Sequence, residues 1–427
     1  GTKFFRAPST MLYIVSFCVA VFAACGTDRV ISGGVRPRYL FAWLGAGLLF
    51  AILGASGGLT NLAAGIASPE RADAVLDNRS DLALGAIRSF AFVAITVALI
   101  WAMSARRITA TVGGSLLVAA AAIDLWSIER SYWMFSPPAA TLYASDDAIR
   151  YLNQQPQPAR VIALPLSADF APGDPFLRPG GQANGLMTHR IRTVLGYHGN
   201  QLGRYNDLLG IDEGGRQIAN PNLWALTNAR FFLTNTDSLP IPGSQRVVGP
   251  VRNAAGTTVY LYRLPGDNPY AWLAPVIAKF PGDQVLATVL DPRFDVRRAA
   301  LFDTGTVVNA KTISALPEPL SNTVTVTRYE PGRVSLTLDQ PSPAGSALLV
   351  SENYYPGWKA TANGQPARLG RADYSLIGVE LPTGTRSVEL AFDSAPYRTG
   401  KTITLIALAL SMLWWLAGAF SERRSRA

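Results

Sequence analysis

The sequence predicts a multi-domain membrane protein with an α-helical transmembrane bundle, an extracytoplasmic α/β domain and a C-terminal β-sandwich. Three observations support this class. Five apolar runs approach the length of about 20 residues that a membrane-spanning helix needs. The long stretch between the fourth and fifth runs mixes helix and strand patterns. Charged residues make up 16% of the chain, against about 25% in soluble proteins.

The apolar runs divide the chain into membrane and non-membrane parts. Four runs lie within residues 1–126, and the fifth lies within residues 401–427, which end in a basic tail. Their expected bounds are about 9–26, 39–56, 82–103, 108–126 and 402–420. The first run has features of a cleaved signal peptide, but the four later runs favour a spanning helix. Because the sequence begins with Gly1 and not Met, we expect it to start inside a longer protein.

Most of the net charge of +9 comes from residues that flank the apolar runs. Residues 127–400 hold 24 Lys/Arg and 22 Asp/Glu, so most of the positive excess lies elsewhere. Arginines occur in loop 27–38, hairpin 104–107 and tail 421–427, which fall on one side if the spans alternate. The positive-inside rule assigns that side to the cytoplasm. We therefore expect a multi-pass protein with a large extracytoplasmic domain, a cytoplasmic C-terminus and no nucleic-acid partner.

Two charged residues lie within the expected spans. Arg88 lies about one turn inside the third span, and Asp124 lies near the end of the fourth. Charges at such depths are costly and often functional. Two interpretations stay open: the side chains reach the membrane surface and anchor the helices, or they bind a polar headgroup in an outer-leaflet cavity.

Residues 127–316 are predicted as an extracytoplasmic α+β domain. Ser145 precedes an acidic first turn, which is typical of the start of a helix. Further short helices are expected at 201–209, at 222–226 and from about residue 283, and strands at 160–166, 229–233, 257–264 and 271–278.

Residues 317–400 are predicted as a β-sandwich domain. Val324 and Val326 alternate with threonines, and a similar alternation returns at 387–392. Asn363-Gly364 lies between two short strand patterns and is typical of a tight hairpin, because both central residues need positive φ. About seven short strands at regular spacing favour a sandwich.

The sequence does not indicate a metal or nucleotide site. Its two cysteines lie in the first apolar run, and it holds two histidines, so we expect no metal and no cofactor in this chain. Gly54–Gly58 matches the spelling of a nucleophile elbow, but it ends a membrane span. Gly400-Lys401-Thr402 resembles the end of a phosphate-binding loop, but Ala395 replaces its first glycine.

Several motifs, in order along the chain, resemble the YfhO family of bacterial membrane proteins. The segment Ser351–Ala360 contains the YPGW motif of that family, and its continuation through Asn363-Gly364 and 378–384 also fits. Upstream, Phe5–Ser9 resembles the Arg-x-Pro start of a later family helix, although Thr10 replaces an expected Arg. Further similar stretches lie at 124–126, 196–200 and 222–231, the last with Phe231 in place of the usual Tyr.

The resemblance implies the later portion of a large protein of the bacterial cytoplasmic membrane, related to the GT-C glycosyltransferases. Such an enzyme transfers sugar from a polyprenyl-phosphate donor to a cell-envelope polymer on the outer face. Its partners would be the lipid bilayer, the lipid-linked sugar and a cell-surface polymer such as teichoic acid. The catalytic acidic residue of the family would lie upstream of Gly1, so no catalytic residue is assigned here. The alternative is a non-catalytic, membrane-anchored scaffold that binds envelope glycans.

Four candidate substrate-binding residues cluster at a predicted loop-to-helix junction: Tyr197, His198, Asn200 and Arg204. Aromatic faces and planar polar groups suit a carbohydrate, and Arg204 or Arg192 would meet a phosphate. The other interpretation is that Tyr197 and His198 pack the domain while Arg204 is a surface charge.

The remaining candidate substrate-binding residues are Arg88, Asp124 and Trp358. Trp358 follows a Pro-Gly bend and has two interpretations. It fills the sandwich core, or it forms an exposed aromatic surface for a glycan. Its position in an alternating β pattern favours the core.

Overall fold

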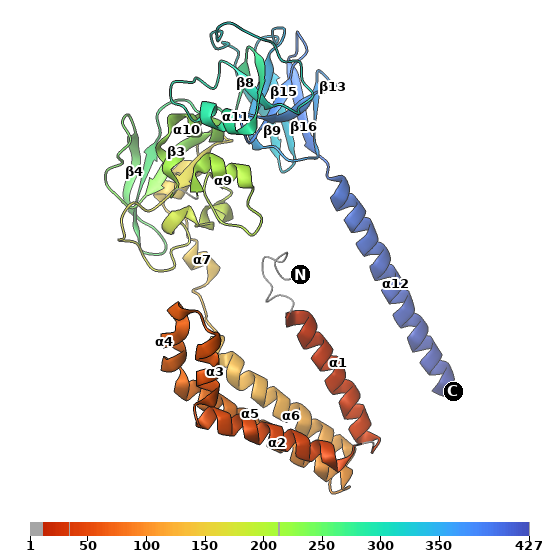
Figure 1. The fold of residues 1–427 in the computed structure, drawn as a ribbon. Coiled ribbons are helices and arrows are strands. Elements are labelled where there is room, and N and C mark those ends of the chain that lie inside the picture. Colours follow the sequence, from red (N-terminus) through yellow and green to blue (C-terminus); the bar gives the residue numbers. More distant parts are fainter. Residues whose placement is uncertain (1–11, 34, 212–213, 427) are drawn as a thin grey trace. The chain divides into compact units, whose positions relative to one another are not determined.

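The computed structural model describes residues 12–33, 35–211 and 214–426, and the chain divides into two compact units at residues 135 and 136 (Figure 1). The motif at residues 5–9, the substitution at Thr10 and the first residues of the first expected span lie outside the described residues.

The first unit is helical. Its helices are α1 (Leu12–Ile31), α2 (Pro37–Ala55), α3 (Gly58–Ile66), α4 (Pro69–Asp77), α5 (Arg79–Ser104) and α6 (Ala110–Glu129), followed by a 3-10 turn at Arg130–Tyr132. Residues 57–81, which lie between the second and third expected spans, contain the helices α3 and α4. Pro69 occupies the first turn of α4, where its missing N–H removes no helical hydrogen bond.

Five helices of the described residues are long and apolar enough to cross a membrane: α1, α2, α5, α6 and α12 (Ala395–Arg426). Most of their described apolar side chains are exposed, as a lipid environment requires. These helices confirm the helical membrane part of the predicted fold class. Helix α12 begins before the span expected at 402, because Ser394 Oγ accepts a hydrogen bond from the Tyr397 amide at 3.3 Å and Pro396 suits a first turn.

Small residues allow close contact between α2 and α5. A Cβ atom added at Gly54 would lie 2.5 Å from Cβ of Ala86. At Gly47 it would lie 3.3 Å from the side chains of Phe90 and Val93. Small side chains at such positions let membrane helices approach and gain van der Waals contact, so this pair forms the packed centre of the first unit.

The second unit begins with a mixed sheet, which we call sheet A. Its strands in spatial order are β2 (Arg192–Thr193), β1 (Arg160–Ala163), β3 (Ala229–Thr234), β5 (Thr258–Arg263) and β4 (Gln245–Arg252). Strand β1 is parallel to both neighbours, and the other pairs are antiparallel. Helices α7 (Ala139–Leu142) and α8 (Asp147–Asn153) precede it. Asp146, and not Ser145, caps α8, because its Oδ1 accepts a hydrogen bond from the Ile149 amide at 2.8 Å.

Two further sheets form the predicted β-sandwich. Sheet B has the order β6 (Ala271–Ala274), β11 (Ala347–Asn353), β15 (Leu376–Glu380), β14 (Leu369–Ala372), β8 (Ala300–Asp303) and β7 (Ile277–Phe280). Sheet C has the order β13 (Gln365–Ala367), β12 (Trp358–Ala362), β16 (Ser387–Phe392), β10 (Arg333–Leu338) and β9 (Val324–Glu330). Asn363 and Gly364, with φ of 49° and 78°, form the predicted hairpin between β12 and β13.

Sheet B crosses the domain boundary expected between residues 316 and 317. Strands β6, β7 and β8 precede that boundary, whereas β11, β14 and β15 follow it. The strand expected at 271–278 is therefore two strands, which lie at opposite edges of the sheet. Separate strand patterns in the sequence do not reveal this, because pairing depends on contacts between distant segments.

Sheet B is buried on both faces. Leu348 and Val350 pack in the core that it shares with sheet C, whereas Leu349 and Trp272 pack in a second core with Ile162 of sheet A. The alternation follows from the two-residue period of a strand. The second core also contains α9 (Gly203–Leu209), α10 (Pro221–Thr227) and α11 (Gly282–Val289), while 3-10 turns lie at Pro179–Gly181, Gly185–His189 and Arg216–Ala219.

Candidate functional site

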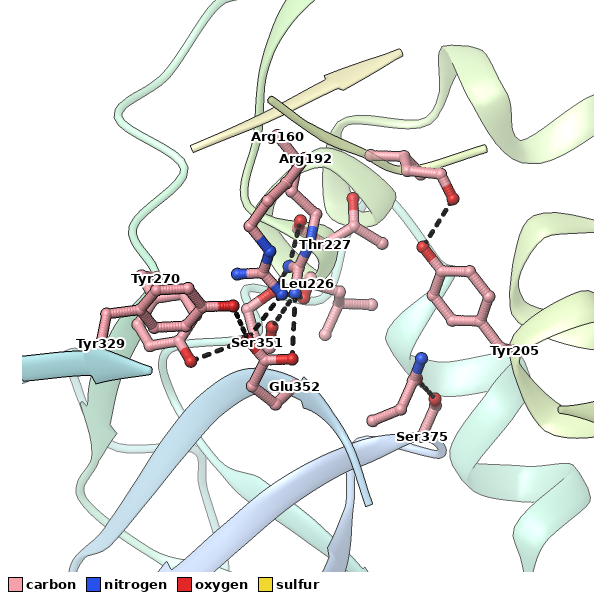
Figure 2. A network of polar contacts seen from close by, with 12 residues as sticks. Arg160, Arg192, Tyr205, Leu226, Thr227, Tyr270, Tyr329, Ser351, Glu352 and Ser375 are labelled. Atoms are coloured by element: carbon pink, nitrogen blue, oxygen red, sulfur yellow. Dashed lines mark hydrogen bonds and ion pairs between the residues drawn. The ribbon is translucent and has the colours of Figure 1, made fainter. Parts of the chain in front are cut away.

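Two arginines on neighbouring strands form the centre of the site. Arg160 begins β1 and Arg192 begins β2, and the two residues are direct partners in the parallel register. Cross-strand partners project from the same face of a sheet. Both guanidinium groups consequently reach the same carboxylate, which lies on β11 of sheet B (Figure 2).

That carboxylate belongs to Glu352. Its Oε1 accepts a hydrogen bond from Arg192 Nη2 at 2.7 Å, and its Oε2 lies 3.4 Å from Arg160 Nη2. The hydroxyls of Tyr270 and Tyr329 also donate to Oε1, at 2.8 and 3.3 Å. The carboxylate is therefore held from several directions by both arginines and both phenols (Figure 2).

Arg160 is fixed by backbone and hydroxyl oxygens as well. Its Nη1 donates to the Thr227 carbonyl at 2.8 Å and to Ser351 Oγ at 2.7 Å, and its Nη2 donates to the Ser351 carbonyl at 2.6 Å. Ser351 Oγ donates in turn to the Leu226 carbonyl at 2.7 Å. Arg160 is 8% exposed, so these bonds replace the water that its guanidinium lost on folding.

The charges of this cluster shift the pKa values of its members. Burial alone would raise the pKa of Glu352, but Arg160 and Arg192 outweigh it and hold that pKa below its usual range. Burial lowers the pKa of Arg192, whereas the nearby Glu352 carboxylate raises it. The effect of the carboxylate is larger with its neighbours included, so the pKa of Arg192 is raised overall. Burial, together with the negative charge of Glu352, raises the pKa of Tyr329 to about 12 and that of Tyr270 further. At neutral pH the cluster thus holds two cations, one anion and two neutral phenols.

Arg192 keeps one donor unused. Its Nη1 atom is buried and has no hydrogen-bond partner among the described residues. The guanidinium carbon lies 4.8 Å from the ring centre of Tyr329 and 6.0 Å from that of Tyr270. Ring faces attract a cation but do not replace a hydrogen-bond acceptor. The arginine is thus held in place with donor capacity to spare.

A cavity of about 850 Å³ opens beside the cluster. Arg160, Arg192 and Glu352 contribute to its wall, together with Tyr197 and His198. Planar polar side chains also line it: Gln182, Asn184, Gln201, Asn206 and Asn353. In the described part of the chain, no three His, Cys, Asp or Glu side chains gather as a metal site requires. The cavity therefore offers aromatic faces, amides and arginines to a polar organic ligand.

Three residues singled out in the sequence line this cavity: Arg192, Tyr197 and His198. The Tyr197 backbone is fixed by Asn184, which accepts from its amide at 3.1 Å and donates to its carbonyl at 2.6 Å. Tyr197 is 50% exposed as a whole residue, so it does not pack as a core residue. His198 Nδ1 accepts a hydrogen bond from the Asn200 amide at 3.1 Å, although Asn200 is not among the lining residues.

Arg204 and Trp358 lie in other environments. Arg204 Nη1 donates to Asp303 Oδ1 at 2.8 Å and to the Tyr374 carbonyl at 3.2 Å, so it is neither a free surface charge nor a cavity residue. Trp358 is half-buried beside the core of sheets B and C, and its ring centre lies 5.4 Å from that of Phe392. Neither residue lines the cavity, and substrate binding by Arg204 or Trp358 stays a prediction.

Arg88 and Asp124 form an ion pair within the first unit. Arg88 Nη2 lies 2.5 Å from Asp124 Oδ1 and donates to Ser127 Oγ at 2.6 Å. The guanidinium also lies over the ring of Phe92. The pair links α5 to α6, and binding of a headgroup by these residues stays a prediction.

No pattern in the sequence marks all members of the cluster, which are Arg160, Glu352, Tyr270, Tyr329 and Ser351, as site residues. Two local signals point to part of it. Arg160 is a charged residue at the start of a strand that is otherwise apolar, and Glu352 lies in the motif-bearing segment Ser351–Ala360. Neither signal shows that the two residues meet, because their contact depends on the pairing of distant strands.

Comparison with known proteins finds a family match in the C-terminal part of the second unit. Residues 307–404 match the family model described as bacterial membrane protein YfhO. The sequence of this segment is similar to that family, and we call residues 307–404 the YfhO segment. The YfhO segment supplies Tyr329, Ser351 and Glu352, whereas Arg160, Arg192 and Tyr270 precede it. The site therefore joins the YfhO segment to sheet A and to Tyr270, which lies directly before β6. No curated protein and no solved structure matches the chain.

Proposed function

We propose that this membrane protein acts in cell-envelope biosynthesis, as part of a machinery that transfers sugar from a polyprenyl-phosphate donor to an envelope polymer. The YfhO match and the five apolar helices support a bacterial membrane protein. The observation that carries the proposal is the cavity of about 850 Å³ lined by Tyr197, His198 and several amide side chains. We assign this cavity to the binding of the glycan.

The lining suits a saccharide for chemical reasons. A sugar ring presents C–H faces that pack on aromatic rings, and hydroxyls that pair with planar amides and guanidinium groups. Tyr197 offers a half-exposed ring, and Asn184 and Gln201 offer amides on the same cavity wall. The volume lies within the usual range for small-ligand sites, about 300–1,000 Å³.

The second unit lies outside the cytoplasmic membrane in this proposal. Arginines in loop 27–38 and in the turn between α5 and α6 place those connections in the cytoplasm by the positive-inside rule. With alternating spans, residues 127–401 then face the outer side. There the cavity would meet surface polymers and lipid-linked sugars.

The lowered pKa of Glu352 favours a second function, in which the cavity binds a glycan without catalysis. A general base works best with a pKa near the operating pH. Glu352 is the carboxylate among the described lining residues, and its two arginines hold its pKa below the usual range. The cavity therefore supports binding better than proton transfer. A non-catalytic glycan-binding scaffold is the alternative function.

The test compares polymer composition in the native bacterium. Deletion of the gene should lower the sugar content of one envelope polymer, as measured by mass spectrometry of the released polymer. The full-length gene should restore it, and a Tyr197→Ala, His198→Ala variant should restore less. Tyr355→Ala, which changes an exposed tyrosine that does not line the cavity, is the control. Unchanged polymers in the deletion strain would refute the proposal.

Reconstitution in liposomes separates the two functions. Sugar transfer from a polyprenyl-phosphate donor to a glycan acceptor by the purified protein supports the transferase. Glycan binding without transfer supports the scaffold. Transfer that is abolished by Asp124→Asn would place the active site in the first unit.

A further inference from the structure

A short helical hairpin, α3 and α4, joins two spanning helices at one end of the first unit. Helix α2 ends at Ala55 and α5 begins at Arg79, and between them α3 and α4 pack on each other and on α5 (Figure 1). A Cβ atom added at Gly54 of α2 would lie 3.6 Å from Cδ1 of Leu59 on α3. The α3–α4 hairpin is therefore fixed to the ends of the spanning helices.

Each helix of the α3–α4 hairpin carries apolar side chains that the described residues leave exposed. On α3, Leu59, Leu62 and Ile66 share one face at helical spacing, and Leu62 and Ile66 are 62% and 79% exposed. On α4, Leu76 is 53% exposed, and the acidic residues lie on a different face. Exposed apolar groups gathered in one place mark an interaction surface.

An aromatic segment, residues 132–135, follows α6 at the same end of the unit. Its four side chains, Tyr-Trp-Met-Phe, are all exposed. The ring centre of Trp133 lies 5.7 Å from that of Trp126 and 6.4 Å from that of Phe135. The ion pair between α5 and α6 holds the start of one helix beside the end of the other. Trp and Tyr concentrate where the hydrocarbon core of a membrane meets the headgroups, because their rings are apolar and their tips are polar.

The lengths of the spans place both features at that border. A helix rises about 1.5 Å per residue and the hydrocarbon core is about 30 Å thick, so about 20 residues cross it. Helix α2 has 19 residues and α6 has 20, so each ends where the core ends. Helix α5 has 26 residues, so its first turns extend beyond the core to meet the α3–α4 hairpin.

The charge of the hairpin region indicates how it would attach to a lipid surface. Residues 57–81 hold four Asp/Glu and two Arg, a net charge of −2. A negative segment gains nothing from anionic lipids, so its affinity for a membrane surface would come from apolar burial.

We infer that the α3–α4 hairpin and the aromatic segment lie in the interfacial layer of the bilayer, with their exposed apolar side chains among the lipids. The partner is lipid, because these side chains continue the exposed apolar surfaces of α2, α5 and α6 at the level where the spans end. This surface is separate from the glycan cavity, so the inference does not depend on the proposed function.

The test measures the surroundings of nitroxide labels on the full chain in phosphatidylcholine nanodiscs, by electron paramagnetic resonance. Single cysteines replace Ile66, Leu76 or Phe135 in a variant whose exposed Cys18 and Cys25 are changed to serine. Oxygen concentrates among acyl chains, whereas a nickel chelate stays in water. The ratio of their relaxation effects therefore distinguishes lipid from water, and we expect a high ratio at all three positions.

Two control positions make the comparison specific. Val307 of the second unit is 75% exposed, so Val307→Cys matches Ile66→Cys in exposure and apolar character and should report water. Asn61 is an exposed polar residue on another face of α3, and Asn61→Cys should give a lower ratio than Ile66→Cys. We expect the ratio at Ile66 and Phe135 to be several times that at Val307.

Three outcomes would overturn the inference. The first is a ratio at Ile66 and Phe135 as low as that at Val307, which would place these residues in water. The second is poor access of both reagents, which would show that protein covers the surface. The third is a high ratio that appears only when phosphatidylglycerol replaces part of the phosphatidylcholine, because apolar burial needs no anionic lipid. Equal ratios in the two lipid mixtures support attachment by apolar burial.

Discussion

Arg160 and Arg192 are direct cross-strand partners in the parallel pair of β1 and β2. Like charges opposite one another destabilise a sheet unless something compensates them. Glu352 provides that compensation from another sheet, with an Nη2–Oε1 distance of 2.7 Å to Arg192 across 160 residues of sequence. The three residues thus tie sheet A to the YfhO segment.

Glu352→Gln should destabilise the second unit by about 3–5 kcal/mol, because it leaves two buried arginines without an anion. Urea unfolding of the purified chain, followed by tryptophan fluorescence, measures the change. Glu330→Gln removes the exposed partner of Arg328 and should barely move the unfolding midpoint. Because the folded pKa of Glu352 is lowered, its contribution is present above its ordinary pKa and is lost as the pH falls below it. Equal midpoints for the Glu352 variant and the parent would contradict this prediction.

Asp373 should make the protein less stable as the pH rises. Its Oδ1 accepts a hydrogen bond from the Leu301 amide, its Oδ2 is buried without a partner among the described residues, and burial raises its pKa from 3.8 to about 7. Since the folded pKa exceeds the unfolded one, this group destabilises the fold progressively between about pH 4 and 7. Asp373→Asn should remove that loss, and Asn tolerates the local φ of 43°.

Thermal melting at pH 5 and pH 8 checks the Asp373 prediction. The advantage of Asp373→Asn over the parent should be larger at pH 8. Asp237→Asn, at an exposed loop position, is the control. A constant difference across this range would show that Asp373 does not titrate there.

Trp358→Ala should lower the free energy of unfolding by roughly 3 kcal/mol, because it removes a half-buried ring from the edge of the core. Glycan affinity should stay unchanged, because Trp358 does not line the cavity. Urea unfolding and calorimetry give the two readouts. Loss of glycan binding at parental stability would instead support the exposed aromatic surface.

Arg88→Leu and Asp124→Leu should each reduce the amount of folded protein in the membrane, because either change leaves one charge unpaired within the helices. The double variant should recover much of the loss. Quantifying the detergent-extracted, monodisperse protein measures this effect. A double variant as poor as the worse single variant would argue for a role of the side chains beyond their mutual pairing.

Reporter fusions test the proposed sidedness. Fusions after Arg107 and after Ala427 should report the cytoplasm, and a fusion after Pro265 should report the outer side. The physical reason is the retention of arginine-bearing short loops in the cytoplasm. An outer-side signal at Arg107 would reverse the orientation.

The sequence by itself determined the elements that depend on neighbouring residues. Apolar runs specify spanning helices because each helix satisfies its own backbone in lipid. Asn363-Gly364 specifies a hairpin because its two residues tolerate positive φ. Alternating valines specified strands of the sandwich, and the order of short motifs indicated the YfhO family.

Tertiary structure decided which strands pair and which charges meet. Sheet B takes β6, β7 and β8 from before residue 317 because its pairing gains hydrogen bonds and burial that no local pattern encodes. Tyr197 and His198 are neighbours in the sequence, so the sequence alone shows them together. Glu352 contacts Arg160 and Arg192 only because distant strands pair and pack in the folded unit. Local conformational propensity depends on a few neighbouring residues. The site instead requires contacts between residues more than a hundred positions apart, whose loop-closure entropy is offset only when the whole unit packs.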